Sequence, residues 1–322
     1  MCSPKAFADD SLSYGPKLYN HALFGQLFKS FAADQKRSAD LIWTRILSKC
    51  GVDPALPAIT HVVDYGCGEG TFLKCLADRS KQASTSTGLT FLGFDCCPDS
   101  IARAQYSSDL NLTVCHRCPE EALNQITVPW KATALLVMGH SWFHFDQDCL
   151  IRAILEHRPA LLLIDVYSTW DEVVSTLRDA TCGEHLLEHG RQLKDAHGST
   201  ITYWLRSEKE TDSPHISRGI WNANAQNWEF KTRQYCRTSD EVFGSSAHFP
   251  TNNEAPETVL RDARTNGMFL EDADHSESRT LAYVHDREYS HQSGWGPMKC
   301  HVLVALDRVS KILNHSWYET IR

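Results

Sequence analysis

Two spacings of apolar residues alternate along the chain between residues 58 and 167. Short, nearly continuous apolar runs are followed by segments whose apolar residues recur every three or four positions. The runs predict strands, and the segments between them predict helices. The expected strands are 61–66, 89–95, 111–117, 132–140 and 159–167. Strands this apolar are typical of a parallel sheet covered on both faces, so we expect a doubly wound, mostly parallel α/β sheet with helices on both sides.

The chain before residue 58 and just after residue 167 has different patterns. Residues 1–57 contain a long amphipathic stretch, which predicts an N-terminal helical cap. Regular alternation fades after residue 167, and we interpret residues 168–255 as an insert or lid that contributes to a substrate site. Polar and apolar residues alternate at 201–209 and 227–237, which predicts two antiparallel strands within this insert.

Residues 256–322 return to the pattern of the core. A helix is expected at 256–267, and strands are expected at 268–274 and 299–308. With these two strands the sheet would have seven. The core domain is therefore expected to comprise residues 58–167 and 256–322.

Composition narrows the range of partners. The net charge is −8 and no basic stripe is visible, so we expect no binding to nucleic acid. The longest apolar runs, 134–138 and 160–164, are far shorter than a membrane span, and the N-terminus does not resemble a signal peptide. We therefore expect a cytoplasmic protein, monomeric or homodimeric, with no membrane partner. The twelve cysteines are interpreted as reduced thiols, and no metal site is expected because no Cys/His pairs recur at matching spacing.

A glycine-rich loop joins the first expected strand to the following helix. Glycine stands at 66, 68 and 70, and Asp64 precedes the first of them. Dinucleotide-binding loops follow the spacing G-x-G-x-x-G, whereas here Thr71 occupies the place of the final glycine. An acid beside the loop suits an amine or sulfonium ligand better than a phosphate. The next strand ends at Asp95, where a carboxylate can accept hydrogen bonds from ribose hydroxyls.

The pattern D-x-G-x-G-x-G, followed by an apolar strand that ends in Asp, resembles the class I S-adenosylmethionine-dependent methyltransferases. The resemblance covers roughly residues 58–167 and, more loosely, 256–308, where the last two strands resemble the closing antiparallel hairpin of that family. It implies a Rossmann-like fold and S-adenosylmethionine (SAM) as the cofactor. The loop would lie against the methionine part of the cofactor, Asp64 would orient its amino-acid end and Asp95 would bind its ribose. The cofactor-binding residues that the resemblance implies are Asp64, Gly66, Cys67, Gly68, Gly70, Asp95, Cys96, Glu120 (or Glu121), Gly139 and His140.

The segment after the fourth strand contains the best candidates for catalysis. His140 or His144 could act as a general base, because the pKa of an imidazole lies near neutrality. Asp165, at the end of the fifth strand, could hold an amine or cap the next helix. Aromatic residues could form the walls of a substrate site or simply pack in the core. The candidate substrate-binding residues are Tyr14, Tyr19, Trp142, Tyr167, Trp221 and Trp228.

We therefore expect a methyltransferase that transfers the methyl group of SAM to nitrogen or oxygen of a small molecule, such as an amine or a secondary metabolite. The enzyme would act in biosynthesis. Two alternatives remain open at this point. One is an NAD(P)-dependent oxidoreductase on a related sheet, and the other is a SAM-binding regulatory protein without catalytic activity.

Overall fold

The computed structural model describes most of the core and part of the remaining chain. The described residues are 22–53, 56–83, 88–105, 110–115, 118–139, 141, 147–166, 191–194, 200–208, 215–222, 227–235, 283–293 and 296–305. None of the helices in these ranges is long and apolar enough to cross a membrane.

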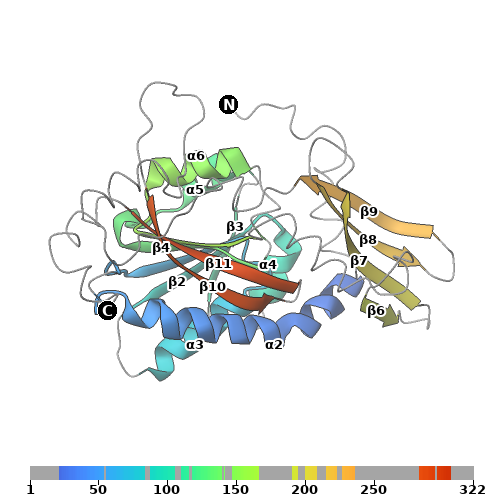
Figure 1. Ribbon diagram of the computed structural model, residues 1–322, viewed down its shortest axis with the longest axis horizontal. Helices are drawn as coiled ribbons and strands as arrows, with labels where there is room; N and C mark the ends of the chain where they lie inside the picture. Colours follow the sequence, from blue (N-terminus) through green and yellow to red (C-terminus); the bar gives the residue numbers. More distant parts are fainter. Residues whose placement is uncertain are drawn as a thin grey trace, which may run out of the picture.

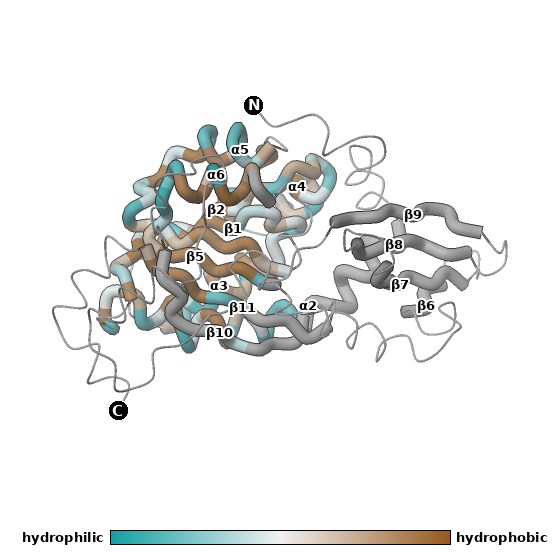
Figure 2. The backbone as a smooth tube through the Cα atoms, turned by 45° about the horizontal axis from the view of Figure 1, so that its top comes forward, coloured by the Kyte–Doolittle hydropathy of each residue, from teal (hydrophilic) through white to brown (hydrophobic). Residues whose placement is uncertain are grey.

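A seven-stranded sheet with the order β10-β11-β5-β4-β1-β2-β3 forms the centre of the molecule (Figure 1). Neighbouring strands from β1 to β5 pair in parallel. They are β1 (His61–Tyr65), β2 (Thr90–Asp95), β3 (Asn111–Val114), β4 (Thr133–Val137) and β5 (Leu161–Val166). Figure 2 shows that the central strands, including β1 and β5, are among the most hydrophobic parts of the chain. The five strands expected from the apolar runs are confirmed.

A long antiparallel hairpin closes the sheet next to β5. Strand β11 (Gly296–Ala305) runs antiparallel to both β5 and β10 (Tyr283–Ser293). The expected hairpin is confirmed, and β11 overlaps the strand expected at 299–308. Its partner was placed wrongly, however, because β10 pairs with β11 and residues 268–274 lie outside the described residues, as does the helix expected at 256–267. Strand β10 is an edge strand with the polar sequence YVHDREYSHQS, so it lacks the apolar run that revealed the buried strands.

The two edges of the sheet differ in length. Strand β3 has four residues, whereas β10 has eleven. The pairing of β10 with β11 shifts register between His285 and Arg287, which is the mark of a β-bulge. The long edge strand, β10, therefore contains a β-bulge, and the other edge strand, β3, is short.

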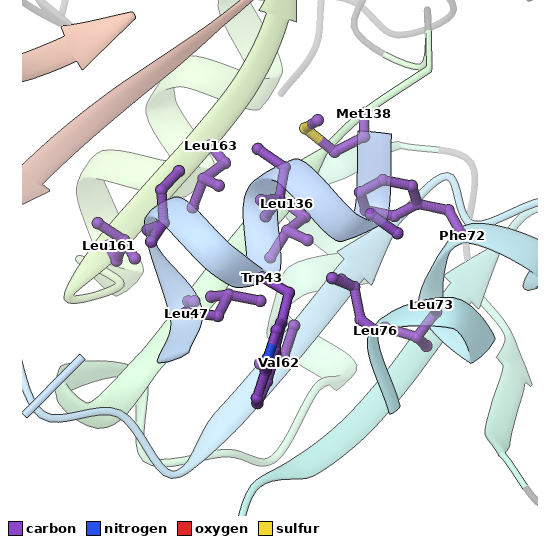
Figure 3. Close-up of a cluster of buried hydrophobic side chains, with 14 of the residues drawn as sticks. Trp43, Leu47, Val62, Phe72, Leu73, Leu76, Leu136, Met138, Leu161 and Leu163 are labelled. Carbon is purple, nitrogen blue, oxygen red and sulfur yellow. The ribbon is translucent and has the colours of Figure 1, made fainter. Parts of the chain in front are cut away.

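Helices cover both faces of the sheet, as a doubly wound fold requires (Figure 1). The residues of α2, α3 and α4 pack in one buried cluster, and those of α5 and α6 pack in another on the opposite face. Figure 3 shows the first cluster, in which Trp43, Phe72 and Leu136 come from a helix, a second helix and a strand. The helices are α2 (Ala22–Arg45), α3 (Thr71–Gln82), α4 (Pro98–Gln105), α5 (Pro119–Gln125) and α6 (Gln147–His157), with short 3-10 turns at Leu47–Lys49 and Trp130–Ala132.

An ion pair joins the first two of these helices. The guanidinium of Arg79 on α3 donates from Nε to Oδ1 and from one Nη to Oδ2 of Asp40 on α2, and the second of these distances is 2.7 Å. The hydrogen bond from Arg79 lowers the pKa of Asp40, although burial opposes this effect. Helix α2, in the predicted N-terminal cap, is thereby fixed to the helix that follows the glycine loop.

A second, four-stranded antiparallel sheet forms within the predicted insert. Its strands are β6 (Arg191–Lys194), β7 (Thr200–Glu208), β8 (His215–Asn222) and β9 (Asn227–Tyr235), paired in chain order. Strands β7 and β9 confirm the two antiparallel strands expected from alternation. Strands β6 and β8 were not predicted, because neither has a clear alternation of polar and apolar residues.

Candidate cofactor-binding site

The candidate site lies at the carboxyl ends of the parallel strands. From β1 the chain proceeds to β2 and β3 on one side, whereas β4 and β5 lie on the other side of β1. Open α/β sheets bind ligands where the order of strands reverses in this way. The loops that follow β1, β2, β4 and β5 should therefore line one crevice.

The glycine loop after β1 is built from left-handed residues. The φ angles are +85° at Gly66, +55° at Gly68 and +71° at Gly70, in the region that other residues rarely adopt. Gly70 also begins α3, since its carbonyl oxygen accepts a hydrogen bond from the N–H of Lys74 at 2.8 Å. The glycines are thus required by the path of the backbone, and this path carries the chain from strand to helix within a few residues.

Most amides of this loop already donate hydrogen bonds within the protein. The N–H groups of Gly66 and Cys67 both donate to the carbonyl oxygen of Phe94, at 2.7 and 3.1 Å, and that of Gly70 donates to the carbonyl oxygen of Cys67 at 2.9 Å. The N–H of Gly68 donates to Asp95. A loop that cradles phosphates needs free amides. Four amides of this loop already donate to acceptors within the protein, so they are not available to a phosphate.

A further glycine, Gly93, lies in β2 close to Cys67 of the glycine loop. No role was predicted for it from the sequence. A Cβ at Gly93 would lie 2.4 Å from Cδ2 of Leu112, 2.9 Å from Sγ of Cys67 and 3.2 Å from Cδ2 of Leu73. No φ requirement applies at this position, so the absence of a side chain serves close packing alone. A glycine inside a strand pattern often marks such a close approach, and this is the signal that could have revealed it.

Asp95, the last residue of β2, connects the glycine loop to the turn before α4. Its Oδ2 accepts a hydrogen bond from the N–H of Gly68 at 2.8 Å, and its Oδ1 accepts one from the N–H of Cys97 at 2.8 Å. Burial raises the pKa of Asp95, and these backbone N–H groups oppose the rise. A carboxylate oxygen has more than one lone-pair site, so Asp95 can also accept hydrogen bonds from ligand hydroxyls.

Asp64, near the end of β1, is a deeply buried acid of the site. The residue is 3% exposed, and among the described residues none donates a hydrogen bond to its carboxyl group. Burial, and to a lesser extent the charges of Asp95 and Asp165, together raise its pKa to about 8. The three carboxyl groups therefore make this edge of the sheet strongly receptive to a cation.

The substitution Asp64→Asn is expected to stabilise the ligand-free protein more at pH 8 than at pH 5. In the unfolded chain Asp64 ionises near pH 4, whereas in the fold it keeps its proton until about pH 8. Between these values the native state binds more protons than the unfolded state, so wild-type stability falls as pH rises, and asparagine removes this loss. The gain in free energy of unfolding should grow by about 3–4 kcal/mol between pH 5 and pH 8, since the two states differ by nearly one bound proton over these three pH units.

Urea denaturation at several pH values measures this gain. The matched control is Asp99→Asn, because Asp99 is exposed on α4. A gain for Asp64→Asn that stays constant across the pH range would contradict the prediction.

The loop after β4 is fastened to its surroundings at two points. The N–H of Gly139, whose φ is +63°, donates to Oδ2 of Asp165 at 2.9 Å. The hydroxyl of Ser141 donates to the carbonyl oxygen of Gly66 at 2.9 Å. Sequence reasoning named Gly139 and Asp165 but missed Ser141, because a lone serine in a loop has no pattern that distinguishes it.

Four of the remaining predicted residues lie within the described part of the chain, and six lie outside it. Cys96 follows Asp95 directly and is partly buried. Glu120 begins α5 and accepts a hydrogen bond from Nε of Arg152 at 2.8 Å, which places it in an ion pair between α5 and α6. Trp221 and Trp228 are paired across β8 and β9. The candidates that lie outside the described residues are His140, His144, Tyr14, Tyr19, Trp142 and Tyr167.

Most of the cysteines in the described residues, eight of them, are free thiols. Cys149, however, is disulfide-bonded, so the expectation of reduced thiols throughout was wrong at this position. Within the described ranges no group of three or more His, Cys, Asp or Glu side chains is arranged to hold a metal ion.

Comparison with known proteins gives matches only among solved structures. No family model and no curated protein matches the chain. CalS10, an amino pentose methyltransferase from Micromonospora echinaspora solved with bound SAM, is 12% identical with a TM-score of 0.46, and the match covers 83% of this chain and 91% of that one. Magnesium protoporphyrin IX methyltransferase (ChlM) from Synechocystis PCC 6803 with bound SAH is 11% identical with a TM-score of 0.45, over 91% and 99%. The sugar N-methyltransferase KedS8 from Streptoalloteichus sp ATCC 53650 is 15% identical with a TM-score of 0.40, over 85% and 87%.

The sheet itself bears out the resemblance found in the sequence. Five parallel strands with a reversal between β1 and β4 are followed by an antiparallel hairpin that ends in the sheet beside β5. The glycine loop follows the first strand, and Asp95 ends the second. The strand order and the β10–β11 hairpin thus agree with the doubly wound sheet and closing hairpin that the resemblance to the class I S-adenosylmethionine-dependent methyltransferases implies.

Proposed function

We propose that the protein is a SAM-dependent methyltransferase that transfers a methyl group to nitrogen or oxygen of a small molecule. The observation that carries the proposal is the combination of a glycine loop with its amides already bonded and three acids at the same edge of the sheet. This edge repels a pyrophosphate and attracts a cation. SAM carries a sulfonium and an ammonium group, so its charge matches the site.

Each acid has a distinct role in this proposal. Asp95 would accept hydrogen bonds from the ribose hydroxyls while keeping those from Gly68 and Cys97. Asp64 would face the positive amino-acid end of the cofactor and ionise when the cation arrives. The backbone of the glycine loop, which has no side chain at three positions, would allow the cofactor to lie against it.

Bound SAM supplies a methyl group on a sulfur that is already activated as a leaving group. The protein therefore has mainly to align the acceptor and to remove a proton where the acceptor carries one. His140 and His144 are the candidates for removing that proton, and Asp165 is a candidate for holding an amine acceptor. Of these three only Asp165 is described, and it is 1% exposed and bonded to Gly139.

A small-molecule acceptor is favoured by the chemistry of the chain. The net charge of −8 opposes contact with nucleic-acid phosphates. The alternating strands of the insert, residues 168–255, provide a second sheet that would complete the acceptor site. Tyr14, Tyr19, Trp142, Tyr167, Trp221 and Trp228 remain the candidates to line it.

Ligand binding separates this proposal from the oxidoreductase. SAM and S-adenosylhomocysteine (SAH) are expected to raise the melting temperature. NADH and NADPH are expected to leave it unchanged, because four amides of the loop already donate within the protein and acids flank the loop. Isothermal titration calorimetry with the same four ligands gives the dissociation constants. Tight binding of NADPH without binding of SAH would reject the proposal.

Turnover separates the enzyme from a regulatory protein that only binds the cofactor. The protein is incubated with SAM and a panel of amines, phenols, amino sugars and carboxylic acids, and SAH is measured by mass spectrometry. We expect SAH to form with at least one class, and the gain of 14 mass units on the acceptor, the mass of a CH₂ group, would identify the product. Native mass spectrometry of the purified protein provides the acceptor directly if product is retained.

A further inference from the structure

Ser141 joins the two loops that lie on either side of the reversal in strand order. Its hydroxyl, four residues after the end of β4, donates to the carbonyl oxygen of Gly66, which begins the loop after β1. Strands β1 and β4 are neighbours, so the bond crosses the crevice where open α/β sheets bind ligands. The two loops belong to different parts of the proposed reaction, since the first contacts the cofactor and the second leads to the acceptor-side histidines.

The two residues that this hydrogen bond joins are each held in place by a backbone hydrogen bond of their own. The N–H of Gly66 donates to the carbonyl oxygen of Phe94 at 2.7 Å, which holds the peptide whose carbonyl Ser141 contacts. The N–H of Ser141 donates to the carbonyl oxygen of Met138 at 3.1 Å, and Ser141 is 7% exposed. Water therefore has little access to compete for the hydroxyl, and the bond should persist in solution.

A second hydrogen bond holds the segment after β4 two residues earlier, at Gly139. Oδ2 of Asp165, at the end of β5, accepts the hydrogen bond from Gly139. Gly139 and Ser141 thus connect β4 to β5 on one side and to β1 on the other. A shift of the glycine loop would reach the loop after β4 only through Ser141, among the bonds that the described residues make between these two loops.

We infer that Ser141 is a positioning residue that couples occupancy of the glycine loop to the backbone of Gly139 and Ser141 after β4. The inference rests on the proposed function, because it takes SAM or SAH to be the occupant. When the ligand binds to the glycine loop, it restrains the carbonyl group of Gly66, and Ser141 transmits this restraint to its own backbone and to that of Gly139. Ser141 touches neither the methyl group nor the acceptor in this role.

Hydrogen exchange measured by mass spectrometry tests the coupling, with SAH as the probe. In the wild-type protein SAH should slow exchange both in peptides that contain residues 66–70 and in peptides that contain Gly139 and Ser141. In Ser141→Ala the slowing at 66–70 should remain, whereas the slowing at Gly139 and Ser141 should fall by about fivefold, the value expected for one hydrogen bond. Ser141→Thr keeps the hydroxyl and should restore it.

Thr133 provides a matched control for the loss of a buried hydroxyl. It lies at the other end of β4, is fully buried, and donates from Oγ1 to the carbonyl oxygen of Pro129 at 2.9 Å. Thr133→Val removes the same kind of bond away from the site. It should leave the SAH-dependent slowing at both loops unchanged.

The outcomes separate the inference from the proposed function. If SAH slows exchange at Gly139 and Ser141 equally in the wild type and in Ser141→Ala, the inference is overturned while the proposed function stands. If SAH slows exchange nowhere in the wild type, the proposed function fails. Ser141→Cys, with a similar size and a weak donor, repeats the test should the alanine variant fold poorly, and it should behave like alanine.

Discussion

Replacing Asp95 with alanine is expected to lower the affinity for SAM by about 100-fold or more. The carboxylate would accept bonds from both ribose hydroxyls, and hydrogen bonds to a charged group each contribute about 1.5–3 kcal/mol, where 1.4 kcal/mol is tenfold in affinity. The substitution also removes the acceptor for the N–H groups of Gly68 and Cys97. The glycine loop would then lose one of its connections to β2, although those to the carbonyl oxygen of Phe94 would remain, and this adds to the loss.

Isothermal titration calorimetry of SAM and SAH measures this effect, with a thermal melt to show that the variant is folded. Asp99→Ala is the matched control, since Asp99 is an exposed acid in the first turn of α4, four residues further along the chain. It should change the dissociation constant by less than about twofold, as expected for a distant, screened charge. Undiminished binding by Asp95→Ala would refute the assignment of the ribose contact.

Replacing Gly93 with alanine is expected to lower the free energy of unfolding by about 3 kcal/mol, at the upper end of the range for overpacking a core. The added Cβ would lie closer than 3.0 Å to Leu112 and Cys67, which is shorter than normal contact, and would also be tight against Leu73. Of the three, Leu112 and Leu73 are fully or almost fully buried, so neither can move without displacing other side chains. Urea denaturation of the purified protein measures the change.

Two comparisons make the interpretation specific. Gly88→Ala adds the same atom just before β2, where nothing lies within 4 Å but φ is +60°, and it should cost only about 1 kcal/mol of backbone strain. Leu112→Ala should relieve part of the clash, so the double variant with Gly93→Ala should be more stable than the sum of the single losses predicts. Strict additivity of the two substitutions would contradict a direct collision.

The parallel strands and the cofactor loop could be predicted from the sequence because local chemistry dictates them. An apolar run such as 160–164 is stable only when buried on both faces. Glycine at 66, 68 and 70 reports a backbone path that other residues resist, and the structure shows positive φ at all three. The acid at the end of β2 could be identified for the same reason, since its place follows from where the strand ends.

Other parts of the site depend on contacts between segments far apart in the chain. Ser141 acts on a carbonyl 75 residues earlier, and nothing in its own neighbourhood reports that partner. Gly93 is needed because the side chain of Leu112, its partner on the neighbouring strand β3, occupies the space beside it. Strand β10 is defined by its pairing with β11 rather than by any apolar run of its own. In each case tertiary packing, and not local preference, selects the residue.

The shape of the two sheet edges has a consequence for the behaviour of the protein at high concentration. Exposed edge strands offer unpaired backbone groups to neighbouring molecules, and long regular edges promote aggregation. Here one edge, β3, is only four residues long, and the other, β10, is interrupted by a bulge and carries the charged run Asp286, Arg287 and Glu288. Continuation of the sheet from one molecule to the next is therefore disfavoured at both ends, and self-association by strand addition should be rare even in concentrated solution.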